Sequence, residues 1–166
     1  LDRVETDKKK SQQILKTVMP TSVANELQSS GKVRSRRYDD VAIFICDLVG
    51  FTSFCEKNNP ELVVETLQEI IESFENTFEE FGLEKIKTVG DAIVAVAGLS
   101  SHATSPIKSC VDCAYKMREI ANSAPTPWDL HVGIHSGSLV AGTVGTKTVQ
   151  FDILGKTVNV AFNICD

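Results

Sequence analysis

The stretch that decides the fold is VAIFICDLVGFT, residues 41–52. Its first six residues form an unbroken apolar run rich in β-branched side chains, which is typical of a strand buried on both faces. Asp47 follows this strand at once, and Gly50 then indicates a turn. A carboxylate in this position either caps the turn or belongs to a functional site.

The chain around this stretch has the composition of one globular domain. It has 166 residues, of which 42% are apolar and 23% charged, and its formal net charge is −5. These values exclude a disordered chain, and no dense run of Lys and Arg predicts a nucleic-acid partner. No stretch approaches the ~18–20 apolar residues of a membrane span, and the charged N-terminus predicts no signal peptide. Five cysteines in a chain of this size indicate a reducing compartment. We therefore expect a cytoplasmic domain, with a membrane anchor outside this chain left open.

Hydrophobic periodicity and turn residues predict the other elements. A polar connector is expected at residues 32–40, and a turn at residues 136–137. Helices are expected at residues 1–29 with a break at Pro20, at 60–81, at 106–122 and after Gly155; strands are expected at 41–46, 84–89, 92–97, 129–134, 138–144 and 148–151. This order predicts an α+β fold with helices on one face of the sheet. It is close to the ferredoxin-like βαββαβ plan and is preceded by an N-terminal helical segment.

A second carboxylate, Asp91, lies at the tip of the expected hairpin beside Gly90. In the split β-α-β plan the first strand lies beside this hairpin, so Asp47 and Asp91 can meet at one edge of the sheet. Two converging carboxylates suit a hard divalent cation such as Mg²⁺, and two such ions can support an in-line phosphoryl displacement. Turn amides at residues 48–52 could hold phosphate oxygens. The alternative is that Asp47 caps its turn and Asp91 occupies a hairpin position that favours Asp.

Five motifs in order resemble those of class III nucleotide cyclase catalytic domains. They are residues 44–52 and 85–92, which resemble the two metal motifs, the glycine-rich segments 133–137 and 140–145, and residues 151–161, which resemble the base- and ribose-reading motif. The resemblance covers residues 36–166, whereas residues 1–35 resemble the helices that join such domains to upstream sensors. It implies a signalling helix and connector at 1–35 and a catalytic domain at 36–166.

The resemblance also implies a role for each matching residue. Asp47 and Asp91 would bind two Mg²⁺ or Mn²⁺ ions, Lys87 and Asp152 would read the base, and Asn159 would orient the ribose. The turn residues Leu48, Val49, Gly50, Phe51 and Thr52 would contact the substrate's phosphates. A lysine donor and an aspartate acceptor suit adenine, whereas guanylyl cyclases typically place Glu and Cys-like residues there. The family forms composite sites between two subunits, so a homodimer of this chain would suffice.

The sequence departs from the family pattern in two places. Asn163 occupies the position of the usual arginine, which stabilises the charged transition state, and Phe162 replaces the small residue before it. A neutral amide cannot supply the charge of a guanidinium. The chain also ends at Asp166, before the family's last hairpin and its phosphate-binding lysine. We expect an adenylate cyclase that converts ATP to cyclic AMP and pyrophosphate as the output domain of a signalling protein. A catalytically impaired pseudocyclase or dimerisation module, and a guanylate cyclase, are the alternatives.

Overall fold

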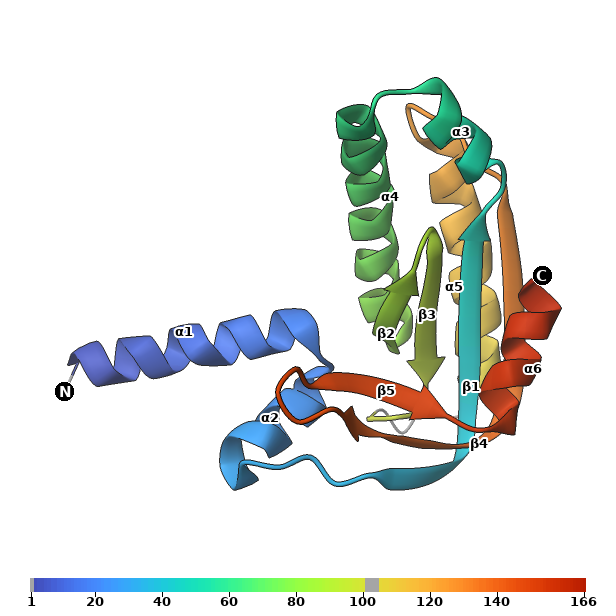
Figure 1. The fold of residues 1–166 in the computed structure, drawn as a ribbon. Helices are drawn as coiled ribbons and strands as arrows, with labels where there is room; N and C mark the ends of the chain where they lie inside the picture. Colours follow the sequence, from blue (N-terminus) through green and yellow to red (C-terminus); the bar gives the residue numbers. More distant parts are fainter. Residues whose placement is uncertain (1, 101–104) are drawn as a thin grey trace.

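The computed structural model describes residues 2–100 and 105–166, and within them the chain alternates helices with the strands of one sheet (Figure 1). The helices are α1 Asp2–Val18, α2 Thr21–Ser30, α3 Phe51–Lys57, α4 Pro60–Phe81, α5 Pro106–Ser123 and α6 Lys156–Cys165. The strands are β1 Arg36–Leu48, β2 Leu83–Val89, β3 Ala92–Ala97, β4 Leu130–Val144 and β5 Gln150–Leu154.

The sheet has the strand order β2-β3-β1-β4-β5, and every neighbouring pair is antiparallel. The first four strands have the order of the ferredoxin-like plan, and β5 extends the sheet beside β4, so the predicted fold class is confirmed. β1 lies at the centre because its apolar run can be buried on both faces. All residues of Val41–Cys46 are 1% exposed or less.

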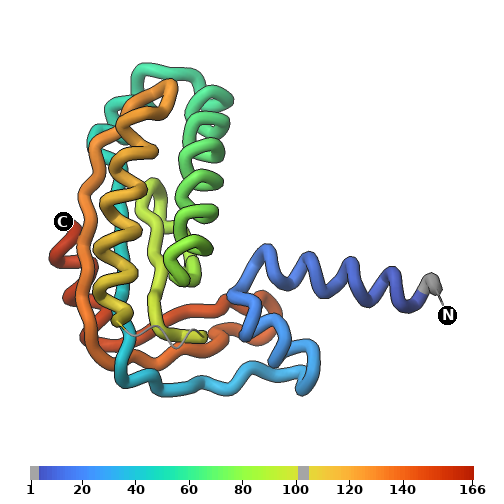
Figure 2. The backbone as a smooth tube through the Cα atoms, turned by 180° about the vertical axis from the view of Figure 1, so that it is seen from behind, coloured from blue at the N-terminus to red at the C-terminus, as the bar shows by residue number. Residues whose placement is uncertain are grey.

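Two apolar clusters lie on opposite faces of the sheet. Phe44 faces α4 and α5, where its ring meets that of Phe78 edge to face at 5.6 Å between centroids. Figure 2 shows α4 and α5 side by side on this face. Ile43 and Ile45 face the other cluster, which includes Ala161 of α6 and Val23 of α2. The prediction that the helices share one face is therefore right for α4 and α5 and wrong for α6.

β4 is one continuous strand, so the turn predicted at Ser136–Gly137 is wrong. Both residues lie in the ladder with β1, where Ser136 pairs with Ala42 and Gly137 with Val41. The irregularity is in β1 instead, because Asp39 and Asp40 together oppose Ser138. β1 also begins at Arg36, inside the expected polar connector, and β5 begins two residues later than expected, at Gln150.

The N-terminal helices break at Pro20, as predicted. α1 ends at Val18 and projects away from the sheet (Figures 1 and 2), while α2 begins at Thr21 and ends at Ser30, capped by Gly31 with a φ of 69°. Val23 and Ala24 of α2 are buried. No helix among the described residues is long and apolar enough to cross a membrane.

Candidate active site

Asp47 and Asp91 come together where β1 passes the tip of the β2–β3 hairpin. Asp47 is the penultimate residue of β1, rather than following the strand, and its neighbour Cys46 pairs with Ile93. Gly90, with a φ of 63°, makes the hairpin turn and is followed by Asp91. Because side chains alternate along a strand, Asp47 lies on the same face as Ile43 and Ile45. The predicted convergence of the two carboxylates is therefore present.

The electrostatics around Asp47 favour a cation. Burial, a side-chain hydrogen bond with Asp91 and the charge of Asp91 raise the pKa of Asp47 to about 6, although the Leu48 amide and His131 act in the opposite direction. Oδ1 of Asp47 is buried and receives no hydrogen bond within the described part of the chain. Two crowded carboxylates with a buried free oxygen fit a divalent cation, whose charge would relieve the repulsion.

The protein contributes two carboxylates here rather than a full ligand cage. Among the described residues, no group of three or more His, Cys, Asp or Glu side chains could hold a metal ion. Mg²⁺ is usually bound by one or two carboxylates, with waters and substrate phosphates completing its coordination. The donor set is thus consistent with a cation that binds together with a nucleotide.

The turn after Asp47 leads into α3, a helix that the sequence analysis missed. The Leu48 side chain is buried in the core, and the Val49 N–H donates to the Asp129 carbonyl at 2.9 Å. Gly50, with a φ of 80°, precedes α3, so Phe51 and Thr52 occupy its first turn, where N–H groups have no intrahelical acceptor. A role in phosphate binding therefore suits the amides of Phe51 and Thr52 better than that of Val49.

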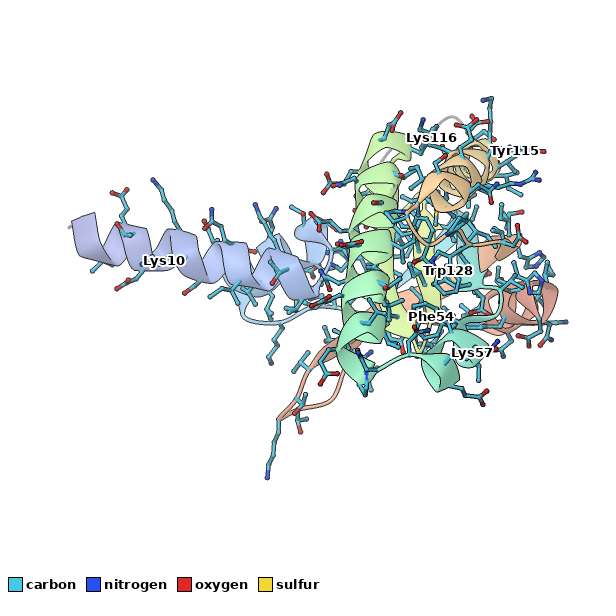
Figure 3. All side chains as sticks on the ribbon, turned by 90° about the horizontal axis from the view of Figure 1, so that it is seen from above. Lys10, Phe54, Lys57, Tyr115, Lys116 and Trp128 are labelled. Carbon is cyan, nitrogen blue, oxygen red and sulfur yellow. The ribbon has the colours of Figure 1, made fainter. Side chains whose placement is uncertain are left out.

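An aromatic cluster holds α3 in place beside Asp47. The rings of Phe54 and Trp128 meet edge to face at 5.1 Å between centroids, and the two side chains lie together in Figure 3. Phe51 also contacts Trp128, with ring centroids 6.0 Å apart. Trp128 is 6% exposed and lies two residues before the start of β4. These contacts fix the turn of residues 49–52 against the rest of the domain.

Lys87 and Asp152, the two predicted base-reading residues, form an ion pair with each other. Lys87 Nζ lies 2.9 Å from Asp152 Oδ2, and both side chains are partly buried, with 26% and 20% exposed. The Ile153 N–H donates to Asp152 Oδ1 at 2.8 Å, which fixes the carboxylate. A fixed cation and a fixed anion in contact can together present a donor and an acceptor to one flat ring.

Asn159 and Asn163 lie one turn apart on α6, and both are exposed. The buried side of α6 packs tightly on β4: a Cβ added to Gly133 would lie 2.5 Å from the Ala161 carbonyl oxygen. Cys165, at the end of α6, was missed by the sequence analysis as a neighbour of the carboxylates. Its Sγ donates to the His131 carbonyl at 3.6 Å, and burial, followed by the charge of Asp47, raises its thiol pKa. Nothing in the local sequence indicates this contact, because it depends on how α6 packs.

Known proteins resemble this chain over most of its length. Residues 33–164 match the model of the adenylate and guanylate cyclase catalytic domain. The chain is 33% identical over 162 residues to guanylate cyclase soluble subunit alpha-2 from Homo sapiens, a match that covers 95% of this chain and 22% of that protein. It is 32% identical over 161 residues to a receptor-type guanylate cyclase of Caenorhabditis elegans, covering 93% of this chain and 13% of that protein. The chain thus spans less than a quarter of the length of these two relatives.

Solved structures agree with the fold. The catalytic core of a rhodopsin-guanylyl cyclase with converted specificity, in complex with ATPalphaS, matches with a TM-score of 0.75 and 25% identity, over 78% of this chain and 73% of that one. A bacterial light-regulated adenylyl cyclase matches with a TM-score of 0.77 over 98% of this chain and 50% of that one; at 18% identity this likeness concerns the fold alone. The family match, together with the fold, shows that the chain belongs to the adenylate and guanylate cyclase catalytic domain family.

Proposed function

We propose that this domain is an adenylate cyclase that converts ATP to 3′,5′-cyclic AMP and pyrophosphate. The family to which the chain belongs consists of nucleotide cyclase domains of the lyase class, which generally act on a nucleotide with divalent metal ions and as dimers. The choice of ATP rests on one observation, the Lys87–Asp152 pair. Adenine presents an acceptor at N1 beside a donor at its 6-amino group, so a lysine donor beside an aspartate acceptor complements it.

In the proposed mechanism the chain binds the base of the nucleotide, orients its ribose and helps to neutralise its phosphates. Lys87 Nζ donates to adenine N1, and Asp152 accepts from the 6-amino group. The exposed Asn159 orients the ribose, and the amides at the start of α3 contact phosphate oxygens. Asp47 and Asp91 would hold two Mg²⁺ or Mn²⁺ ions, whose chemistry is to acidify the ribose 3′-hydroxyl and to neutralise the triphosphate. The 3′-oxygen then attacks the α-phosphorus in line, and pyrophosphate leaves.

A guanylate cyclase is the second candidate, and the comparisons favour it. The two sequence relatives described above are both guanylate cyclases by name. Guanine presents a donor at N1 and an acceptor at O6, the reverse of adenine, so GTP would require Lys87 and Asp152 to exchange their roles or move apart.

A pseudocyclase is the third candidate, carried by Asn163. This exposed amide replaces the usual arginine of the family, so the domain would bind nucleotide and dimerise with little turnover. An active wild-type domain with Asn163 in place would rule this candidate out.

We further propose a homodimer with composite sites and an upstream sensor that acts through residues 1–35. The proposed location is the cytoplasm, with or without attachment to a membrane through regions outside this chain. The names of the relatives include a soluble subunit and a receptor-type protein, so this family serves both arrangements.

The deciding experiment measures cyclic AMP and cyclic GMP made from ATP and GTP with Mn²⁺, in a chain that carries this domain with its natural flanking sequence. We expect cyclic AMP from the wild type and none from Asp47→Ala. Equal product from both would overturn the cation assignment, and cyclic GMP as the main product would overturn the choice of ATP.

A matched pair of lysines tests the base-reading assignment. Lys87→Gln should raise KM for ATP about tenfold, the scale of one lost charged hydrogen bond. Lys85→Gln is the control, because Lys85 lies on the same strand but pairs with Glu75 of α4. An equal effect of both substitutions would show that Lys87 acts through general charge or stability rather than through the base.

A further inference from the structure

The N-terminal segment, residues 2–35, reaches the strand pair that carries Asp152. Gly142 of β4 lies directly opposite Asp152 of β5. Directly opposed residues point to the same face of a strand pair, so Gly142 and the Asp152 side chain share one face. A Cβ added to Gly142 would lie 2.5 Å from Ser35 Oγ and 3.0 Å from Ser35 Cα. Ser35 is therefore in direct contact with Gly142, the residue beside Asp152.

Glu26 of α2 holds the connector on both sides of Ser35. Its Oε1 accepts from the Arg34 backbone N–H at 3.2 Å, and its Oε2 lies 3.0 Å from the Arg36 guanidinium. The Glu26 side chain is only 20% exposed, which strengthens these contacts relative to those of a fully solvated pair. Arg36 in turn pairs with Ala141 in the β1–β4 ladder. A displacement of α2 must therefore move Ser35.

The other member of the base-reading pair also faces the N-terminal segment. A cavity of about 710 Å³ is lined by residues 16–21, where α1 gives way to α2, and by Lys87. In addition, Val23 of α2 is buried in the same apolar cluster as Phe151 and Ile153, the two neighbours of Asp152 in the chain. Asp47 lies elsewhere, because it pairs with His131 near the opposite end of β4 from Gly142.

We propose that Ser35 and Glu26 are positioning residues for Asp152, so that the N-terminal segment sets base recognition and not cation binding. The proposal rests on the proposed function, in which Asp152 and Lys87 contact the base. The contact between Ser35 and Gly142 fixes the strand pair and with it the Asp152 carboxylate that pairs with Lys87. A shift of α2 then changes nucleotide affinity and the choice between adenine and guanine, while kcat at saturating nucleotide and the response to Mn²⁺ stay constant.

Gly142→Ala tests the contact. The φ of Gly142 is not in the left-handed region, so alanine fits the backbone and its effect comes from the clash with Ser35. We expect KM for ATP, and the Kd of a fluorescent ATP analogue, to rise about tenfold, a typical strength for coupled neighbouring sites. The kcat should stay within about twofold of the wild-type value. The rise in Tm that Mn²⁺ induces should stay within about 1 °C of that in the wild type.

A second-site change supplies the rescue. Ser35→Gly removes the Oγ and Cβ atoms that the new methyl group meets and leaves only Cα at 3.0 Å, so Ser35→Gly/Gly142→Ala should recover part of the lost affinity. Ser136→Ala is the matched control, because Ser136 lies on the same strand as Gly142 but is exposed. Glu26→Gln keeps an acceptor for the Arg34 N–H and loses the charge facing Arg36. It should therefore weaken ATP binding, but by less than Gly142→Ala does.

Three results would overturn the proposal: an unchanged KM in Gly142→Ala, a loss of kcat or Mn²⁺ response as large as the loss of affinity, or no rescue by Ser35→Gly. A readout without nucleotide separates this proposal from the proposed function. The coupling energy between Lys87 and Asp152, measured by a double-mutant cycle on urea unfolding, should fall in the Gly142→Ala background. If the protein binds neither ATP nor GTP, the proposed function fails, and this coupling energy alone decides whether Ser35 positions Asp152.

Discussion

Asp47 lies among groups that oppose one another electrostatically. Burial and Asp91 make its negative charge unfavourable, while the Leu48 amide and His131 partly offset this. The ionised form of Asp47 is therefore unfavourable until a cation binds beside it. Lys87 and Asp152 are the opposite case, because each neutralises the other before any nucleotide binds.

Removal of the Asp47 charge should stabilise the cation-free protein. The pKa of Asp47 in the folded chain, about 6, lies above its value of ~3.9 in an unfolded chain. Ionisation therefore destabilises the fold, with no effect below about pH 4 and the full effect above about pH 6. Asp47→Asn in EDTA should gain ~1 kcal/mol of unfolding free energy at pH 7.5, after allowance for partial exposure. Urea unfolding measures it.

The control for that substitution is Asp129→Asn, at an exposed carboxylate beside the same end of the sheet. It should leave stability unchanged, and Mn²⁺ should raise the Tm of the wild type and of Asp129→Asn but not that of Asp47→Asn. Asp47→Asn less stable than the wild type at pH 7.5 in EDTA would contradict the assignment of repulsion at this site.

Asn163→Arg should raise turnover. An exposed position accepts a guanidinium without burial of its charge, and such a group can stabilise a phosphoryl transition state by orders of magnitude. We expect kcat to rise at least tenfold or so, with Asn163→Gln, which stays neutral, near the wild type. Steady-state assays with Mn²⁺ measure this. Equal kcat in the wild type and Asn163→Arg would show that the Asn163 amide does not lower the turnover rate.

The sequence predicted the meeting of Asp47 and Asp91, because a strand end and a hairpin tip follow from local patterns. It did not predict that Lys87 and Asp152 form an ion pair, since 65 residues separate them and the contact depends on how β5 lies against β2. The same limit applies to Cys165, which reaches the His131 carbonyl only through the packing of α6.

At the scale of elements, short-range signals failed where tertiary contacts decide. α3 has seven residues, too few for a clear period, and its Phe51 and Phe54 rings are held by Trp128. Ser136–Gly137 looks like a turn in the sequence. Gly137 instead allows Thr157 of α6 to lie close to β4, since an added Cβ would lie 2.8 Å from Thr157 Oγ1. Long helices such as α4 were predicted well, because the Asn59 cap and the apolar stripe agree.

Gly133→Ala should displace α6 and destabilise the protein. The added methyl group would meet backbone atoms, the Ala161 carbonyl oxygen at 2.5 Å and the Cys165 nitrogen at 2.7 Å, which no rotamer change can relieve. We expect a loss of about 2 kcal/mol in urea unfolding, the usual cost of overpacking. Ser136→Ala, exposed on the same strand, is the control and should change stability little. A Gly133→Ala protein as stable as the wild type would mean that α6 can move freely on β4.

At the scale of the whole molecule, the far end of the β4–β5 pair exposes apolar side chains. Val140 and Leu154 lie opposite each other and are 41% and 56% exposed, and Val144 on the same face is 56% exposed. Asp152 lies among them, paired with Lys87. An apolar patch around a site residue suits the proposed dimer, in which a second copy completes each site.

Complementation tests the composite site. Asp47→Ala and Asn159→Ala chains should each be inactive alone. Mixed in equal amounts, they should recover about one quarter of wild-type activity, because half the dimers are mixed and one of their two sites is intact. Asp47→Ala mixed with Asp91→Ala is the control and should stay inactive, since both changes fall in the same half of each site. Recovery in that control would contradict the proposed division between subunits.

The grip of Glu26 on both neighbours of Ser35 has a consequence for protein engineering. α2, the connector and the first residues of β1 are held together as one rigid unit, whereas Pro20 separates α1 from this unit. A chimaera that gives this domain a new input module should therefore be spliced just before Thr21. A splice between Gly31 and Arg34 would exchange Glu26 for a foreign residue. The imported module would then lack the contacts with Arg34 and Arg36 that couple α2 to the domain.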